Sequence, residues 1–281
     1  MREIHELKRY ALKLFYIGDN YYGFQIQLEK DTIQRRIIDA LKKANLFDDM
    51  KYADFGYSGR TDRFVHSLGQ VIAFNTDKNI IIPQINSYLP IDIKFYGWAE
   101  VSLDFRPRYQ AKYREYKYIT YDDGLDIEAM RKGAKEFQGK HNFKLLSKGP
   151  HPDNTIREIY NIEINKLDEK LICITVKGQS FLHEMVRRIV NVLLDIGRNN
   201  LGSVQIKDYF NPELFSKLKI QAAPIKSGGD LILYHCEYDL KFEYDRYTVN
   251  KIKEIIEERL KSNFIETSTN NLFYDYFNQI K

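Results

Sequence analysis

The sequence predicts an α+β protein of two related halves that share an extended antiparallel sheet, with helices on one face and a cleft on the other. Its 281 residues fit two units at about 150 residues per domain. With 43% hydrophobic and 29% charged residues, collagen, a coiled coil and bulk disorder are excluded. Strand and helix patterns then recur twice in the order β-α-β-β-α-β, which is typical of ferredoxin-like domains.

The first half supplies one set of these elements. Partly alternating apolar residues predict an opening strand that ends at the turn Gly18-Asp19-Asn20. Apolar residues at helical spacing predict a helix, with Asp31 and Gln34 placed as a capping box. Pro83 opens a second, short helix. The predicted elements are strands at 9–16, 51–57, 70–75 and 94–101 and helices at 31–45 and 83–88.

The second half repeats this order without a visible sequence repeat. Strands are predicted at 113–121, 156–165, 171–177 and 231–238, and helices at 126–137 and 180–196. Another helix is predicted at 249–260, and the polar stretch 262–271 predicts a loop or flexible tail. We therefore divide the chain into an N-terminal half at 1–107, a C-terminal half at 108–240 and a helical extension at 241–281.

Positive charge is concentrated in the middle of the chain. The net charge is only +4, but residues 105–121 carry five basic side chains against one acidic, and residues 129–149 carry six against one. Basic residues alternate with tyrosines in the first of these segments. Such a segment in a cleft would suit the phosphates of a nucleic acid.

No membrane segment, leader or cofactor site is expected. No apolar run reaches the roughly 18 residues of a spanning helix, and the N-terminus lacks the apolar core of a signal peptide. A cytoplasmic location is therefore predicted. The two cysteines, Cys173 and Cys236, supply neither a zinc quartet nor a disulfide framework. We expect neither a metal nor a cofactor.

The densest polar cluster lies in the loop 58–67, between two predicted strands. Donors on Arg60, Thr61 and His66 could hold the charge of the Asp62 carboxylate and keep it ionised. An ionised carboxylate can act as a nucleophile. A turn with solvated charges explains the same pattern, so spacing alone leaves both interpretations open.

The order of motifs from about residue 10 to 240 resembles the TruA family of tRNA pseudouridine synthases. The central motif is Gly59-Arg60-Thr61-Asp62-x-x-Val65-His66-x-x-x-Gln70-Val71-x-x-Phe74. The others are Tyr22-Gly23-Phe24-Gln25-x-Gln27, Phe105-x-x-Arg108-Tyr109-x-Ala111-x-x-Arg114-x-Tyr116-x-Tyr118, Phe137-x-Gly139-x-His141-x-Phe143, Gly178-x-Ser180-Phe181-Leu182-x-x-Met185-Val186-Arg187, and Leu231-x-Leu233-x-x-x-x-Tyr238. The resemblance implies RRM-like halves with an RNA-binding cleft.

The resemblance assigns the catalytic roles. Asp62 matches the nucleophile that acts on a tRNA uridine, whose uracil is detached, turned and rejoined through carbon five without a cofactor. Whether the carboxylate attacks ribose or base stays open. Tyr116 matches the tyrosine that stacks on the base and could help remove the proton from carbon five, with Tyr118 as the weaker alternative. Arg187 matches the basic partner of Asp62.

Further residues are expected to contact substrate or RNA. Arg60 matches the arginine that helps to extrude the base, and Leu231 matches an apolar residue against the pocket. Arg188 is predicted to contact phosphate, and so are Lys112 and Arg114, which lie among the tyrosines of the segment 109–121. The resemblance also implies a homodimer that holds the tRNA elbow and anticodon arm, with the target uridine on the 3′ side of the anticodon.

Alternatives and departures from the pattern remain. A catalytically silent RNA-binding protein of the same fold is the main alternative, and an enzyme with a phosphorylated aspartate is the second. Where the family has a small residue and glycine, this chain has Arg63-Phe64, which predicts a loop without a glycine-type backbone conformation. A small insertion, Gly228-Gly229-Asp230, precedes Leu231. His66, His141 and His183 are expected to be structural.

Overall fold

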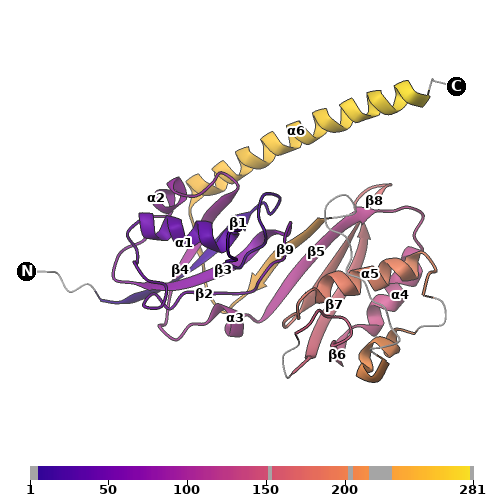
Figure 1. Ribbon diagram of the computed structural model, residues 1–281, viewed down its shortest axis with the longest axis horizontal. Helices are drawn as coiled ribbons and strands as arrows, with labels where there is room; N and C mark the ends of the chain where they lie inside the picture. Colours follow the sequence, from indigo (N-terminus) through magenta and orange to yellow (C-terminus); the bar gives the residue numbers. More distant parts are fainter. Residues whose placement is uncertain (1–5, 151–153, 202–204, 215–229, 279–281) are drawn as a thin grey trace, which may run out of the picture.

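One sheet runs through the whole body of the molecule. The computed structural model describes residues 6–150, 154–201, 205–214 and 230–278. Within them, ten strands form a sheet in the order β10-β4-β1-β3-β9-β5-β8-β7-β6, with β2 paired to β3. Figure 1 shows the two halves side by side, with α1 and α2 over one and α4 and α5 over the other. The predicted α+β class is confirmed.

The N-terminal elements follow the predicted order. They are β1 (Lys8–Tyr16), α1 (Ile33–Lys43), β2 (Gly56–Tyr57), β3 (His66–Thr76), α2 (Ile82–Ser87) and β4 (Ile93–Val101). The capping box is wrong, because Thr32 occupies the N-cap and no side chain caps the helix. Asp31 instead forms a two-bond ion pair with Arg36, and Gln34 accepts from the Ile26 amide.

The C-terminal elements also follow the predicted order. They are α3 (Pro107–Gln110), β5 (Tyr113–Tyr121), α4 (Ile127–Glu136), β6 (Gly139–Asn142), β7 (Ile156–Lys166), β8 (Leu171–Gly178), α5 (Met185–Gly197), the 3-10 turns η1 (Ile206–Phe210) and η2 (Pro212–Leu214), β9 (Asp230–Glu237), β10 (Glu243–Tyr244) and α6 (Arg246–Asn278). The sequence missed β6, which is only four residues long. It also placed the start of α5 five residues too early, because Glu184 adopts a left-handed conformation (φ 57°).

Strand β9 joins the two halves. It pairs with β3 in parallel over two residue pairs, and with β5 in antiparallel fashion. Tyr16 faces Ser67, Ser67 faces Leu233, and Leu233 faces Tyr116. Because laterally paired residues point to the same side of a sheet, these four residues form one row across the junction.

All four covering helices lie on the face of this row. Tyr16 packs in a core with Ile33 and Ile37 of α1, whereas Tyr116 packs in a core with Ile189 of α5. The sequence predicted a cleft on the face away from the helices. That placement is wrong for the predicted catalytic residues, because the side chain of Tyr116 points to the helix face at the gap between the two helix layers.

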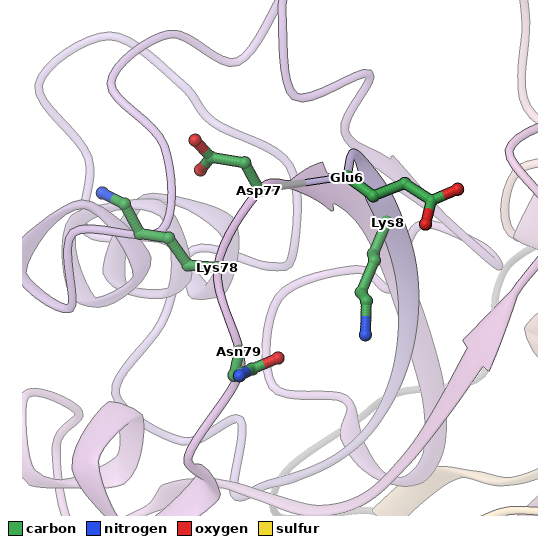
Figure 2. A pocket seen from close by; sticks show the side chains of 5 residues that line it. All are labelled: Glu6, Lys8, Asp77, Lys78 and Asn79. Atoms are coloured by element: carbon green, nitrogen blue, oxygen red, sulfur yellow. The ribbon is translucent and has the colours of Figure 1, made fainter. Parts of the chain in front are cut away.

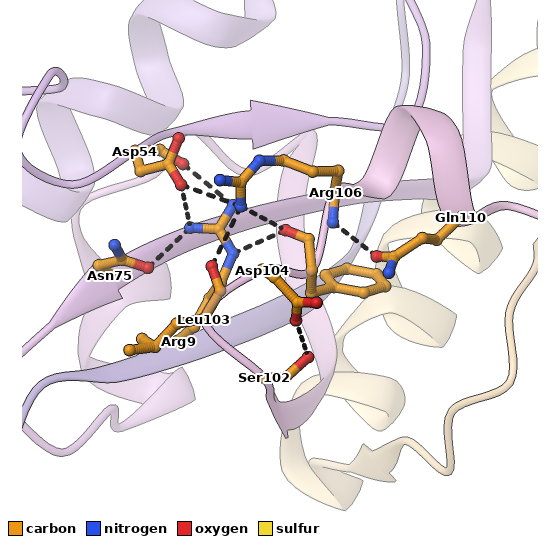
Figure 3. A network of polar contacts seen from close by, with 9 residues as sticks. Arg9, Asp54, Asn75, Ser102, Leu103, Asp104, Arg106 and Gln110 are labelled. Atoms are coloured by element: carbon orange, nitrogen blue, oxygen red, sulfur yellow. Dashed lines mark hydrogen bonds and ion pairs between the residues drawn. The ribbon is translucent and has the colours of Figure 1, made fainter.

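A buried arginine fixes the segment that links the halves. Arg9 of β1 is fully buried and donates to the carbonyl of Phe105 at 2.8 Å and to Asn75 at 2.7 Å. It also pairs with Asp54 at 3.3 Å, which Arg106 contacts at 3.0 Å (Figure 3). Asp54 adopts a left-handed conformation (φ 46°) and its carbonyl accepts from Arg9. The strand predicted at 51–57 is therefore reduced to its last two residues.

Helix α6 is longer than predicted. The sequence placed a helix at 249–260 and a loop or flexible tail at 262–271, but one helix runs from Arg246 to Asn278. Its first turn is anchored, because Thr248 is buried and accepts from Asn86 at 3.1 Å. Figure 1 shows its far end projecting away from the body. The loop prediction is wrong for residues 262–271.

Candidate active site

The loop 58–65, which we call the nucleophile loop, connects β2 to β3 over the junction of the halves. Ser58 donates its backbone amide to Val71 at 2.8 Å, and Gln70 donates its side-chain amide to Gly59 at 2.8 Å. The Thr61 hydroxyl lies 2.7 Å from that of Tyr16, a member of the central row. The loop is therefore fastened to the helix face of the sheet at its start and at its centre.

Two glycines of the segment 18–24 let this loop pack closely. A Cβ atom on Gly23, which has a φ of +89°, would lie 2.8 Å from the carbonyl oxygen of Thr61, and one on Gly18 would lie 2.2 Å from that of Val65. The Phe24 amide donates to the same Thr61 carbonyl at 2.9 Å. Phe64 itself has a φ of 69°, so the loop adopts a glycine-type conformation without a glycine. The prediction of a loop without a glycine-type conformation is therefore wrong at Phe64.

Arg114 of β5 supports the nucleophile loop from below. Its side chain is 5% exposed and donates to the carbonyl of Ser58 at 2.7 Å, of Arg108 at 2.7 Å and of Gln179 at 2.9 Å. It thus connects the loop to the linker segment and to the turn before α5. In this conformation the guanidinium is buried and contacts protein carbonyls, whereas Lys112, another predicted phosphate contact, is exposed.

Asp62 lies between two basic groups of the other half. Its carboxylate is 3.4 Å from Nε2 of His183 and 3.9 Å from Nη1 of Arg187. The Asp62 side chain is 30% exposed, so a ligand can reach it. Burial raises the pKa of Asp62 above its ordinary value, and the charges of His183 and Arg187 act against that rise. The structure thus brings the predicted nucleophile and the predicted basic partner together.

His183 is the site residue that sequence reasoning missed. It was expected to be structural, yet it is closer to Asp62 than Arg187 is. The available signal was its position four residues before Arg187 within the helix predicted at 180–196, although in the structure His183 lies in the turn before α5.

Glu184 organises the cations around this site. Its carboxylate contacts Arg188 at 3.0 Å, Lys148 at 3.3 Å and Arg187 at 4.0 Å. Burial acts to raise the pKa of Glu184, but hydrogen bonds from Arg188 and Lys148 lower it overall. Arg188, a predicted phosphate contact, is therefore already paired with a carboxylate at the start of α5.

The two candidate tyrosines are buried side by side along β5. Tyr116 is 8% exposed and meets the ring of Phe181 edge-to-face at 5.2 Å between centroids. Tyr118 is fully buried and pairs with Leu231, which is also buried. Burial raises the pKa of Tyr116 well above its ordinary value and that of Tyr118 to about 12. Both phenols are therefore neutral near pH 7.

The remaining candidates lie at the surface. Arg60 is exposed and donates to the hydroxyl of Tyr57 at 3.2 Å. Arg63, which the sequence treated only as a departure from the motif, is exposed and lies over the ring of Tyr22 at 4.2 Å. Lys112 is exposed immediately before the first residue of β5 and pairs with Asp239 at 2.9 Å. Arg60 and Arg63 thus flank Asp62 in sequence and face solvent.

A separate hollow is not part of this site. It has a volume of about 420 Å³ and is lined by Glu6, Lys8, Asp77, Lys78 and Asn79 (Figure 2). Lys8 pairs with Thr76 at the first residue of β1, whereas Tyr16 is its last residue. At about 3.3 Å per residue, the two ends of β1 lie about 26 Å apart. The hollow therefore has no contact with Asp62.

The described residues contain neither a metal-ligand cluster nor a membrane-spanning helix. Across 6–150, 154–201, 205–214 and 230–278, no three His, Cys, Asp or Glu side chains are grouped to hold a metal ion. No helix in that part of the chain is both long and apolar enough to cross a bilayer.

Comparison with known proteins identifies the class. A family model described as tRNA pseudouridine synthase matches residues 134–239. The tRNA pseudouridine synthase A of Methanosphaera stadtmanae is 36% identical over 90% of this chain and 92% of its own, and that of Thermococcus sibiricus is 37% identical over 90% and 94%. A solved archaeal box H/ACA sRNP Nop10-Cbf5 complex matches at a TM-score of 0.37 and 13% identity, covering 67% of this chain and 44% of that one. This similarity is too weak to add to the assignment.

The full-length relatives settle the family. Because they exceed 30% identity over nine tenths of this chain, the chain belongs to the TruA family of tRNA pseudouridine synthases. It is therefore an isomerase that acts on tRNA, and the resemblance noted in the sequence is confirmed.

Proposed function

We propose that Asp62 is the nucleophile of a pseudouridine synthase that modifies uridines of the tRNA anticodon stem-loop, on the 3′ side of the anticodon. The contact of a solvent-accessible Asp62 with both His183 and Arg187 is the observation that supports this most directly. Positive charge on these two groups favours the charged carboxylate that nucleophilic attack requires. The anticodon target follows from the family resemblance.

The surrounding residues suit the separate steps of the reaction. Arg187 carries a permanent charge and can stabilise the negative charge of the detached uracil. Tyr116 is neutral and buried, which suits a stacking platform better than a base that must first ionise. Leu231 and Tyr118 form the apolar wall behind it. The isomerisation moves one bond within the substrate, so we propose no cofactor.

Access to the uridine requires that the base leave its stack. Flipping costs a few kcal/mol and needs contacts that hold the extruded nucleotide. Arg60 and Arg63 are exposed on either side of Asp62, and Lys148 lies beside Glu184 at the same edge. We propose that these three side chains bind the phosphates next to the flipped base, with Lys112 and Arg188 further along the RNA.

The assembly and location are also proposed from the resemblance. We infer a cytoplasmic homodimer in which one subunit holds the tRNA elbow while the other acts on the anticodon arm. Within each subunit we propose halves at 1–107 and 108–240 and an extension at 241–281.

The test is product mapping on unmodified tRNA transcripts. Carbodiimide-induced reverse-transcription stops are compared for the native protein, Asp62→Ala and a control variant, Glu115→Ala. Glu115 precedes Tyr116 on β5, and its carboxylate pairs with Lys117 at 3.6 Å. We expect stops in the anticodon arm with the native protein and Glu115→Ala, and none with Asp62→Ala, while all three bind tRNA equally because phosphate contacts dominate affinity.

Two results would contradict the proposal. Stops that persist with Asp62→Ala would exclude Asp62 as the nucleophile. Tight tRNA binding by the native protein without any stops would favour the silent RNA-binding alternative.

A further inference from the structure

Helix α6 contacts the segment 18–24 through an ion pair. The Arg259 guanidinium donates to the Asp19 carboxylate at 2.7 Å, across 240 positions of the chain. Arg259 is half-buried and is followed by a run of exposed residues, 260–277. Thr248 anchors the first turn of the same helix, about 16 Å away at 1.5 Å per residue. The ion pair therefore forms close to the point where α6 leaves the body of the subunit (Figure 1).

The segment 18–24 in turn packs against the backbone of the nucleophile loop. A Cβ atom on Gly23 would lie 3.2 Å from the carbonyl carbon of Asp62. The Phe24 amide donates to the carbonyl of Thr61, the residue before Asp62, at 2.9 Å. Closely packed protein interiors transmit strain. A shift of this segment would therefore displace the backbone of Asp62 itself.

His66, immediately after the nucleophile loop, gives the segment a second contact. Its Nδ1 accepts from the Gly18 amide at 3.1 Å, so the proton of the neutral ring lies on Nε2. Nε2 lies 3.9 Å from the carboxylates of both Asp19 and Asp230. Two carboxylates thus face one neutral histidine, and Arg259 brings a positive charge to them. The contact with His66 and the charge of Arg259 lower the pKa of Asp230, whereas burial acts to raise it.

These carboxylates lie where the two halves of the sheet join. His66 is the first residue of β3, Asp230 is the first residue of β9, and His66 pairs with Ile232 of β9. The charge of Arg259 therefore acts at the point where the nucleophile loop enters the sheet. A partly exposed ion pair contributes little to stability. We expect the contact to affect the geometry of the site more than the stability of the fold.

We propose that Arg259 is a positioning residue for Asp62. By holding Asp19, it keeps the segment 18–24 and His66 against the nucleophile loop. The inference rests on the proposed role of Asp62 and gives the helical extension a part in supporting the active site. Small displacements of a reacting group lower the rate strongly, so the effect falls on the chemical step and not on tRNA affinity.

Single-turnover product formation on tRNA tests this role. Arg259→Gln and Asp19→Asn should each lower the rate constant about tenfold and leave the dissociation constant for tRNA unchanged. The double variant should be no slower than the slower single variant, because both changes break the same contact. Arg259→Lys should recover part of the rate. Lys251→Gln is the matched control, since it breaks a 2.8 Å ion pair with Glu254 within the same helix, and it should keep the native rate.

Hydrogen exchange measures the positioning without reference to catalysis. The amides of Gly18 and Phe24 hold the segment to His66 and Thr61. Peptides that contain these amides should exchange about tenfold faster in Arg259→Gln than in the native protein. The control variant should exchange at the native rate. Peptides of β8 should be unchanged in both variants, which would show that the fold is intact.

Three results would overturn the inference. The first is a native rate with native exchange in Arg259→Gln. The second is weaker tRNA binding with an unchanged rate, which would make Arg259 an RNA contact. The third is an additive loss in the double variant. Product formation by Asp62→Ala together with faster exchange in Arg259→Gln would instead count against the proposed nucleophile, and not against the support of the loop.

Discussion

The nucleophile loop and the turn before α5 meet at Asp62 from opposite halves, yet they are held in different ways. The loop is fixed by hydrogen bonds and close backbone packing, through the Thr61 hydroxyl, Gly23 and the Ser58 carbonyl, which accepts from Arg114 of the other half. The turn is fixed by ion pairs centred on Glu184. The difference indicates that hydrogen bonds from both halves position the carboxylate, whereas the charged groups beside the turn set its charge.

Loss of the permanent cation should have the largest effect. Arg187→Gln removes the charge 3.9 Å from Asp62 and is expected to lower kcat about 10²–10³-fold, as when a transition-state donor is removed. Thermal stability should change little. The measurement is single-turnover product formation on tRNA, with Arg188→Gln as the control that retains Arg187. Equal losses in both variants would show that α5 contributes general RNA affinity rather than local charge.

Loss of the loop support should act on stability first. Arg114→Met leaves three carbonyls without their buried donor and should lower the free energy of unfolding by at least about 3 kcal/mol, at roughly 1–3 kcal/mol per unsatisfied group. Urea denaturation measures the change, and Arg114→Lys should recover part of it. Unchanged stability with weaker tRNA binding would instead restore the predicted RNA contact.

Loss of His183 should shift a pH profile. The charge of His183 opposes the rise in the pKa of Asp62, so His183→Gln should raise that pKa further and move the acid limb of kcat/KM to higher pH. Glu184, Arg187, Lys148 and Tyr116 also act on this carboxylate in the native protein. His183→Arg supplies a permanent charge and should keep the native acid limb. An unshifted limb in His183→Gln would make the histidine a bystander.

The smallest effect is a gain in stability. Because burial raises the pKa of Asp62 in the folded protein, the folded state binds more protons than the unfolded chain, and stability falls as pH rises through that window. Asp62→Asn removes this penalty. Its melting temperature should exceed that of the native protein at pH 7, and the gain should vanish below about pH 4, where the unfolded aspartate is protonated. A gain that persists at low pH would exclude this electrostatic origin.

Local patterns predicted much of this protein. The alternation of apolar and polar residues predicted both the first and the last residue of β5. Pro83 predicted the start of α2 to within one residue. The predictions failed where a distant partner decides the local conformation. The strand at 51–57 is shortened because Asp54 turns to meet Arg9, and α5 starts late because Glu184 turns toward Lys148 and Arg188. Arg9 and Lys148 are both distant in sequence from the element that each changes, whereas Arg188 belongs to α5 itself.

The sequence by itself determined the order of elements, the loop that carries Asp62 and, through the motifs, the family. Periodicity and turn chemistry act over a few residues, so one chain displays them directly. Only the tertiary structure decided that the site lies on the helix face, that His183 reaches Asp62 and that Arg114 is buried beneath the loop. Those facts depend on β9 pairing between β3 and β5. This register brings residues more than 50 positions apart within a few ångströms of one another, and no local pattern specifies it.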